Sequence, residues 1–240
     1  MKKTASDSWF ARRMMRLTRG ERRFVNDPAN AERVARIAGS LLERVTLPPE
    51  PRCLEIGCGQ GAVTRLLVEQ YGARVVASDY DPEQVALAQE RLSDLDDHVE
   101  CRVMDARAMP FDDAQFDGVV AFQVMHHIPG GWRQVVAETA RVLRPGGWFV
   151  FTDLVLPPRA GRLVGRLLPR LDQAEETVLH ACLAENGLHL EHYESSRGGI
   201  LAGLMGHCAA VARRIAASSG DSENDLRLDR HERGGVPIPR

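Results

Sequence analysis

Three glycines and one acid in the first third of the chain have the types and the spacing needed to hold a nucleoside. Gly57, Gly59 and Gly61 alternate with other residues after a short apolar segment, and Asp79 follows eighteen residues after the last glycine. Because glycine has no Cβ, the backbone of such a turn can approach a ligand closely. The carboxylate of Asp79, at the tip of a strand expected over 74–78, can accept hydrogen bonds from both hydroxyls of a ribose. These residues predict the first half of a nucleotide-binding β-α-β unit.

The spacing of the glycines separates two kinds of nucleotide site. A dinucleotide turn follows the pattern G-x-G-x-x-G, in which the third glycine closes the turn around a pyrophosphate. This chain instead has Glu55 followed by G-x-G-x-G over 57–61, a pattern that resembles the first motif of the class I S-adenosylmethionine-dependent methyltransferases. A nicotinamide-dependent oxidoreductase is therefore the weaker alternative, and comparing the binding of NADH and S-adenosylmethionine would separate the two.

The segments that must position these residues follow in the order of that family from about residue 50 to 153. They are a helix that starts at Pro82, strands over 99–104, 115–122 and 148–152, and an acid, Asp105, after the first of these strands. The resemblance implies a Rossmann-like α/β fold, a three-layer α/β/α sandwich. Its sheet is expected to be mostly parallel and seven-stranded, in the order 3-2-1-4-5-7-6, with one antiparallel edge strand and an N-terminal helical cap.

The resemblance also implies S-adenosylmethionine as the cofactor and assigns residues to its parts. The glycine turn would hold the methionine end, Asp79 the ribose, and Asp105 with the backbone of Ala106 the adenine. Tyr80 either stacks beside the adenine or is a half-exposed loop aromatic, and Glu55 either orients the glycine turn or only packs. The cofactor-binding residues expected in this way are Glu55, Gly57, Cys58, Gly59, Gly61, Asp79, Tyr80, Met104, Asp105, Ala106, Phe122 and Gln123.

Two adjacent histidines, His126 and His127, follow the fourth strand, where the methyl donor and the acceptor are expected to meet. The sequence -HHI at 126–128 resembles that of many small-molecule methyltransferases of the type 11 group. One imidazole could remove a proton from an acceptor hydroxyl, since its ordinary pKa of about 6.5 allows this near neutral pH. In the interpretation that we favour, His127 packs against the next helix and His126 only lines the pocket, because methyl transfer from a sulfonium often needs alignment alone. Either way, these two are the candidate catalytic residues.

The composition is that of one α/β domain with additions. The 240 residues are 44% hydrophobic and 27% charged, which is ordinary for a soluble protein. Five cysteines without a C-x-x-C pair predict neither a structural zinc nor a disulfide framework, and they fit the reducing cytoplasm. The sequence contains no apolar run of membrane-spanning length and no signal peptide. We therefore expect a cytoplasmic protein without a metal.

Composition and pattern divide the chain into three parts. These are a basic segment with a cap helix over 1–48, a methyltransferase domain over 49–217, and a disordered tail over 218–240. Apolar positions at helical spacing predict that the cap helix covers 29–45. A later helix over 172–186 and two strands over 188–193 and 204–211 are expected to complete the sheet.

The basic segment at the start of the chain is a clue to the substrate. Eight Lys and Arg side chains against two acids give residues 1–24 a net charge of +6. Over 9–24, apolar and basic side chains would lie on opposite sides of a helix. Such a helix either covers the domain, which we favour, or contacts an anionic membrane surface.

The absence of certain motifs narrows the range of possible methyl acceptors. The signature [ND]-P-P-[YFW], typical of amino-group methylation on adenine or glutamine, would start near Gln123 and is absent, and no Pro-Cys pair supplies the nucleophile of a 5-methylcytosine enzyme. No nucleic-acid recognition module is present, so we expect no nucleic-acid partner. The sequence predicts an S-adenosylmethionine-dependent methyltransferase acting on a small-molecule or lipid-like acceptor. The alternative is a non-catalytic sensor or assembly partner that binds the same cofactor, which tight cofactor binding without turnover would favour.

Overall fold

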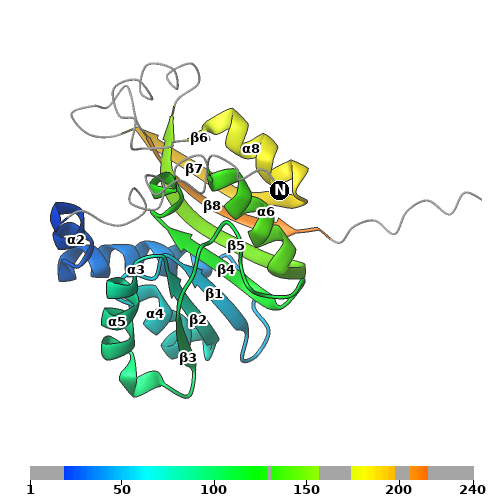
Figure 1. Ribbon diagram of the computed structural model, residues 1–240. Coiled ribbons are helices and arrows are strands. Elements are labelled where there is room, and N and C mark those ends of the chain that lie inside the picture. The colour runs from blue at the N-terminus through cyan, green and yellow to red at the C-terminus, as the bar shows by residue number, and fades with distance from the viewer. Residues whose placement is uncertain (1–18, 129–130, 157–173, 198–205, 216–240) are drawn as a thin grey trace, which may run out of the picture.

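Helices cover both faces of one sheet in the computed structural model, which describes residues 19–128, 131–156, 174–197 and 206–215 (Figure 1). The strands are β1 (Arg52–Ile56), β2 (Arg74–Asp79), β3 (Val99–Val103), β4 (Phe116–Phe122), β5 (Leu143–Leu156), β6 (Ala174–Glu175), β7 (Leu188–Arg197) and β8 (Gly206–Arg214). They lie in the order β3-β2-β1-β4-β5-β8-β7, and the two-residue β6 pairs with β5. With β6 set aside, this is the predicted order 3-2-1-4-5-7-6.

The directions of the strands also agree with the sequence. β1 pairs in parallel with β2 and β4, and the parallel pairing continues to β3 on one side and to β5 on the other. β8 pairs antiparallel with both β5 and β7, so it is the one strand that runs against the others in the main sheet. The fold prediction is confirmed, and the antiparallel strand lies second from the edge, between β5 and β7.

The described helices divide between the two faces of the sheet (Figure 1). They are α2 (Arg19–Val25), α3 (Pro28–Leu42), α4 (Ala62–Tyr71), α5 (Pro82–Arg91), α6 (Trp132–Val142) and α8 (Glu176–Glu185), with short 3₁₀ turns η2 (Ser93–Leu95) and η3 (Met125–His127). Buried side chains of α6 and α8 share one core with the sheet, and those of α3 and α4 share a second core. The central strands β1, β2 and β4 are therefore buried on both faces, which explains why they read as continuous apolar runs.

Local sequence signals set the starts of two helices that border the site. Asp27 caps α3, since its carboxylate accepts a hydrogen bond from the backbone N–H of Ala29 at 2.8 Å. Asp81 caps α5 in the same way through Glu83 N, at 3.1 Å. In both helices proline occupies the first position, where its missing N–H costs nothing. The cap helix expected over 29–45 is thus confirmed, although it ends at Leu42.

The C-terminal part differs from the sequence expectation at one helix boundary. The helix expected over 172–186 begins at Glu176, because Ala174 and Glu175 pair with Val155 and Leu156 as β6. The two closing strands form the expected hairpin and are longer than predicted. Most of the basic segment (1–18), residues 157–173 and the tail over 218–240 lie outside the described residues.

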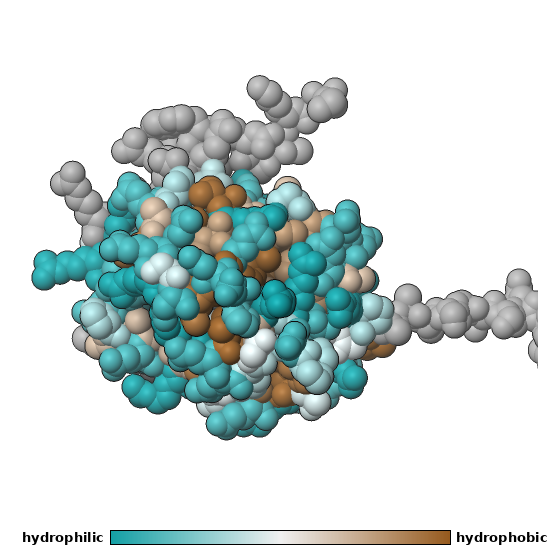
Figure 2. All heavy atoms as spheres, turned by 90° about the horizontal axis from the view of Figure 1, so that it is seen from below, coloured by the Kyte–Doolittle hydropathy of each residue, from teal (hydrophilic) through white to brown (hydrophobic). Residues whose placement is uncertain are grey.

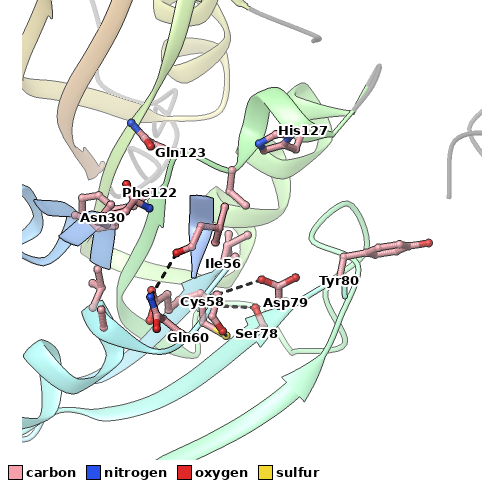
Figure 3. A pocket seen from close by; sticks show the side chains of 18 of the residues that line it. Asn30, Ile56, Cys58, Gln60, Ser78, Asp79, Tyr80, Phe122, Gln123 and His127 are labelled. Carbon is pink, nitrogen blue, oxygen red and sulfur yellow. Dashed lines mark hydrogen bonds between the residues drawn. The ribbon is translucent and has the colours of Figure 1, made fainter. Parts of the chain in front are cut away.

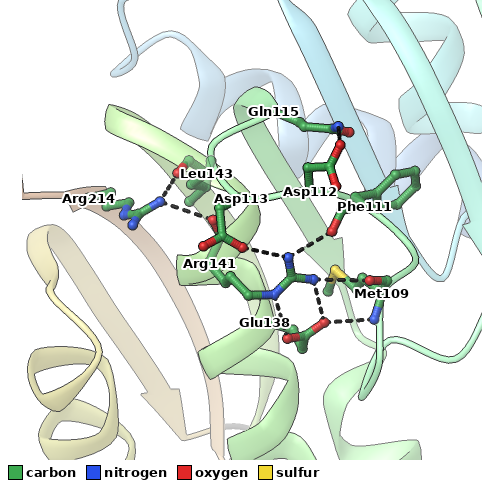
Figure 4. Close-up of polar contacts among 9 residues, drawn as sticks. All are labelled: Met109, Phe111, Asp112, Asp113, Gln115, Glu138, Arg141, Leu143 and Arg214. Carbon is green, nitrogen blue, oxygen red and sulfur yellow. Dashed lines mark hydrogen bonds and ion pairs between the residues drawn. The ribbon is translucent and has the colours of Figure 1, made fainter.

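One arginine of α6 fixes the loop between β3 and β4, which forms a wall of the site. The guanidinium of Arg141 donates to the carbonyls of Met109 at 3.0 Å and Phe111 at 2.7 Å (Figure 4). It also pairs with Asp113 at 2.9 Å and with Glu138, whose carboxylate accepts from Met109 N at 2.7 Å. These bonds give the loop a defined path although it has no regular secondary structure.

Few large apolar side chains of the described residues reach the solvent. Only Val103 and Ile215 among them are both large and exposed. On the face that Figure 2 presents, hydrophobic areas are narrow and lie between hydrophilic side chains. The described surface therefore carries the mixed polar character that is normal for a folded domain.

Candidate functional site

A cavity of about 790 Å³ lies at the carboxyl ends of the central strands. Ile56, Asp79 and Phe122, which end β1, β2 and β4, all line it, and α2, α3 and the start of β8 contribute further walls. The strand order reverses between β1 and β4, which is where open α/β sheets bind their ligands. The volume is in the upper part of the range of about 300–1,000 Å³ found for small-molecule sites. The cavity therefore has room for two ligands side by side.

Almost all residues that the sequence singles out line this cavity. They are Glu55, Gly57, Cys58, Gly59, Asp79, Tyr80, Met104, Ala106, Phe122, Gln123, His126 and His127. The two exceptions are Gly61, which caps α4, and Asp105, whose carboxylate forms an ion pair with Arg107 at 2.7 Å. Figure 3 shows Cys58, Gln60 and Asp79 gathered at one end, while Tyr80 extends away from them.

The structure gives a different reason for two of the three glycines than the sequence suggested. All three have positive φ, at 70° for Gly57, 51° for Gly59 and 85° for Gly61. A Cβ at Gly57 would lie 2.1 Å from Cγ2 of Val124, and one at Gly61 would lie 2.6 Å from Cδ1 of Leu92. These two glycines are therefore required by packing within the protein itself. Only at Gly59 does a Cβ meet no protein atom closer than 3.5 Å.

Asp79 closes the glycine turn from the end of the neighbouring strand. Its Oδ2 accepts from Gly59 N at 3.2 Å (Figure 3), and its Oδ1 accepts from Asp81 N at 2.9 Å. Burial raises the pKa of this carboxyl, while the backbone hydrogen bonds lower it. Both carboxylate oxygens accept backbone hydrogen bonds, and a carboxylate with about four lone-pair sites keeps the capacity for a further bond. The group can thus accept the hydroxyls of a ribose without giving up its place in the turn.

Two polar side chains beside the turn offer further acceptors to a cation. Glu55 is buried and accepts a hydrogen bond from the hydroxyl of Thr64, and burial raises its pKa to about 8. Gln60 donates through Nε2 to the carbonyl of Val25 at 3.4 Å, whereas its buried Oε1 has no partner among the described residues. A buried acceptor without a donor is costly. An ammonium group in the cavity would satisfy it.

Arg33 of α3 brings a positive charge to the same cavity. Its guanidinium donates to Oδ1 of Asn30 at 2.8 Å and to Oε1 of Gln123 at 3.3 Å, and no ion pair joins it to a carboxylate of the described residues. Gln123 itself is held with φ at 56°, an uncommon backbone conformation for a residue other than glycine, while its N–H donates to Thr152 O at 2.7 Å. Arg33 can therefore bind a carboxylate that enters the cavity.

A buried acid holds one of the two histidines. Asp153, near the end of β5, is 3% exposed and accepts from His126 Nδ1 at 2.6 Å. Its carboxylate also accepts from the backbone N–H groups of Met125 and Leu154, both at 2.7 Å. The ring of His127 lies 4.0 Å from that of His126, and both residues line the cavity. His126 is thus held by an acid that the sequence analysis did not single out.

A third histidine, His207 of β8, lines the same part of the cavity. Its strand position pairs with Leu154 of β5, one residue after Asp153. Burial lowers the pKa of His207, the charges of Arg33 and His126 lower it further, and Asp153 opposes them. No local motif marks Arg33 or His207, because they come from α3 and β8. Asp153 could have been found by extending the search for strand-end acids to the fifth strand.

The described part of the basic N-terminal segment covers the glycine turn. Val25 and Gly20 of α2 line the cavity. Arg22 fastens this helix to the start of α5, since it pairs with Asp81 at 2.9 Å and with Glu83. At least this basic side chain therefore acts in the contact between the cap and the domain.

The described residues show neither of two other kinds of site. No group of three or more His, Cys, Asp or Glu side chains within them could hold a metal ion. None of the helices described is both long and apolar enough to pass through a membrane.

Comparisons with known proteins agree with this geometry. Residues 54–151 match the family described as the methyltransferase domain. The 27-O-demethylrifamycin SV methyltransferase of Amycolatopsis mediterranei is 33% identical over 174 residues, which are 68% of this chain and 63% of that protein. The 2-methyl-6-phytyl-1,4-hydroquinone methyltransferase of Synechocystis sp. is 38% identical over 109 residues, 45% of this chain and 33% of that protein. The chain thus spans less than two thirds of the length of these curated relatives.

Solved structures share the fold. Geranyl diphosphate C-methyltransferase from Streptomyces coelicolor A3(2), in complex with S-adenosyl-L-homocysteine, superimposes with a TM-score of 0.66. The match covers 80% of this chain and 84% of that one, at 18% sequence identity. At this identity the likeness concerns the fold alone.

Proposed function

The chain belongs to the class I S-adenosylmethionine-dependent methyltransferases, and from this premise we propose that it transfers the methyl group of that cofactor to a small, apolar or lipid-like acceptor. The observation that carries the proposal is that one continuous cavity has two chemically different ends. It contacts the glycine turn and Asp79 at one end and His126 and His207 at the other. A cofactor at the first end would therefore share the cavity with an acceptor at the second.

The chemistry of the first end fits the parts of the cofactor. Asp79 would hold the ribose through its free lone pairs. The ammonium of the methionine part would meet Oε1 of Gln60, and its carboxylate would meet Arg33, whose described partners are neutral amides. The ammonium would thus meet a neutral hydrogen-bond acceptor, and the carboxylate would meet a positive charge.

The adenine is assigned to the wall formed by the segment after β3. Met104 and Ala106 line the cavity there, together with Tyr80. Asp105 would accept a hydrogen bond from the adenine amino group in exchange for one of the bonds that its carboxylate accepts from the backbone and side chain of Arg107. Gly61 would act only through the turn, since it starts α4.

The second end supplies the acceptor site. When bound, the cofactor supplies an electrophilic methyl group on a sulfonium that leaves as a neutral thioether. The chain would hold the acceptor in line with that methyl group and keep water away from it. His126 and His127 would orient the acceptor or take its proton. Apolar side chains that line the cavity, and that favour an apolar acceptor, are Val25, Val34, Phe122, Val124, Ile128 and Leu154.

Three finer expectations stay predictions. Contact of residues 9–24 with a membrane surface is one, since 9–18 lie outside the described residues and Arg22 pairs with acids of α5. A cytoplasmic location and the absence of a nucleic-acid partner are the others. The three-part division of the chain at residues 48 and 217 is proposed on the pattern of its sequence.

Calorimetric titration of S-adenosylmethionine and S-adenosylhomocysteine tests the proposal. We expect binding by the wild type, weakened at least about tenfold in Asp79→Ala, because hydrogen bonds to a charged group are lost. Asp97→Ala is the matched control, since Asp97 is an exposed acid just before β3 that does not line the cavity. Absence of binding by the folded wild type, or equal loss in both variants, would contradict the cofactor site.

A further inference from the structure

His126 and Asp153 are joined by a buried hydrogen bond. A histidine that only aligned an acceptor would not need such a bond to an acid. The 2.6 Å distance joins Nδ1 of the histidine to Oδ1 of the acid, and the side chains are 8% and 4% exposed. A carboxylate only accepts hydrogen bonds, so Nδ1 must carry the proton that is shared with it. In the neutral imidazole Nε2 then has a free lone pair.

Backbone hydrogen bonds hold the carboxylate of Asp153 in place, and this carboxylate in turn holds His126. The carboxylate of Asp153 accepts from the N–H groups of Met125 and Leu154, so η3 and the end of β5 hold it from two sides. Since the donors around it are already placed, Asp153 cannot turn away without leaving buried N–H groups unpaired. His126 is therefore held in one orientation before any ligand arrives.

The surroundings of His126 favour a proton acceptor over a charged anchor. His207 shares this part of the cavity, and burial lowers its pKa, which favours its uncharged form. Ile128 and Leu154 add apolar walls. An acid placed behind an imidazole stabilises the positive charge that forms when the ring takes a proton. Methyl acceptors that are already nucleophilic at neutral pH, such as carboxylates and thiolates, have no use for such a pair.

We propose that His126 is the base for an acceptor hydroxyl, that Asp153 is its positioning residue, and that methylation therefore occurs on oxygen. This inference rests on the proposed function. The proton passes from the acceptor oxygen to Nε2 of His126, and the electron pair of the broken O–H bond stays on oxygen. That oxygen forms the new bond to the methyl carbon, whose former bonding pair leaves with sulfur. A phenol, whose pKa near 10 keeps it protonated at neutral pH, is the simplest acceptor of this kind.

The test is nitrogen NMR of the histidine side chains in the full chain, with 2-naphthol as the probe. We expect His126 to carry its proton on Nδ1 and to leave Nε2 unprotonated in the wild type. Addition of 2-naphthol should shift the Nε2 resonance of His126, because the naphthol O–H donates to it. The matched probe is 2-methoxynaphthalene, which has the same ring and no hydroxyl proton. His98, which is exposed and does not line the cavity, is the control in the same spectrum.

Two results would overturn the proposal. One is a proton on Nε2 of the wild-type His126, and the other is an Nε2 resonance that 2-naphthol moves no more than the ether does. Asp153→Asn should remove the preference for the Nδ1 proton, and its folding is checked by its melting temperature. Titration of S-adenosylhomocysteine into the same sample keeps the two claims apart. Loss of cofactor binding refutes the proposed function, whereas the state of His126 is read without it.

Discussion

The two ends of the cavity are assembled from very different stretches of chain. The end assigned to the cofactor takes most of its polar groups from the stretch between Glu55 and Asp79, which contains the end of β1, the glycine turn, α4 and β2. The opposite end joins His126, Asp153 and His207, which come from η3, β5 and β8. A short stretch can place its own side chains through turn geometry. The second arrangement exists only once the sheet has brought β5 and β8 together.

The two ends also differ in how their charges are balanced. At the glycine turn, burial raises the pKa of both Glu55 and Asp79, and no ion pair joins either carboxyl group to a basic side chain of the described residues. At the other end Asp153 has a histidine and backbone donors around it. The first end suits a ligand that brings its own positive charge, and the second suits a neutral group that gives up a proton.

The largest effect is expected from breaking the glycine turn. Gly57→Ala puts a Cβ into Val124 and forces alanine into a positive φ, so we expect cofactor binding to be abolished and stability to fall by more than about 1–3 kcal/mol. Gly72→Ala is the matched control, because Gly72 has φ at 61° and nothing within 4 Å of its Cβ position. Urea denaturation and calorimetry measure both effects. Equal destabilisation of the two variants would show that the contact with Val124 is unimportant.

A change at the other end should separate catalysis from cofactor binding. Asp153→Asn removes the acceptor for His126 Nδ1, so turnover of a confirmed hydroxyl acceptor should fall about 100-fold. The affinity for S-adenosylhomocysteine should stay the same, because Asp153 does not line the cavity. Steady-state rates and calorimetry check this pair of outcomes. If turnover by Asp153→Asn is unchanged, this end of the cavity only aligns the acceptor and does not take its proton.

Arg33 sharpens the comparison because it donates a hydrogen bond to Gln123 and its charge also lowers the pKa of His207. If Arg33 binds the methionine carboxylate, the variant Arg33→Met should bind S-adenosylhomocysteine about tenfold more weakly than the wild type does. The same variant should bind 5′-methylthioadenosine, which lacks that carboxylate, as tightly as the wild type does. Arg36→Met, an exposed change on the same helix, controls for loss of charge. An equal loss of affinity for both ligands would contradict the assignment of Arg33 to the ligand carboxylate.

A last effect concerns stability alone and is a pH dependence at Glu55. Its pKa is raised from 4.5 to about 8, so the folded protein holds this proton more tightly than the unfolded chain. The free energy of unfolding of the wild type should therefore fall as the pH rises from about 4.5 to about 8, and then level off. Glu55→Gln should lack this part of the pH dependence. Parallel stability curves for the two proteins over this range would contradict the raised pKa.

Much of the fold and the cofactor end could be predicted from the sequence. An acid at the end of a strand and the spacing of glycines are local patterns, spanning a few tens of residues. They are therefore sufficient to predict the glycine turn and Asp79. The reason for Gly57 was missed, since its neighbour Val124 is far away in the chain. Arg33, Asp153 and His207 were missed because no local pattern marks residues that meet only through the order of the strands. Asp105 is a different case, because its partner Arg107 lies only two residues further along the chain and the strand-end position of the acid does not reveal that pairing.

A crystal structure of the protein with S-adenosylhomocysteine would test the division of the cavity most directly. The prediction is that the ribose hydroxyls lie on Asp79, that the ligand carboxylate lies on Arg33, and that the space beside His126 is left for an acceptor. A ligand that fills the space beside His126, or that lies away from Asp79, would contradict it.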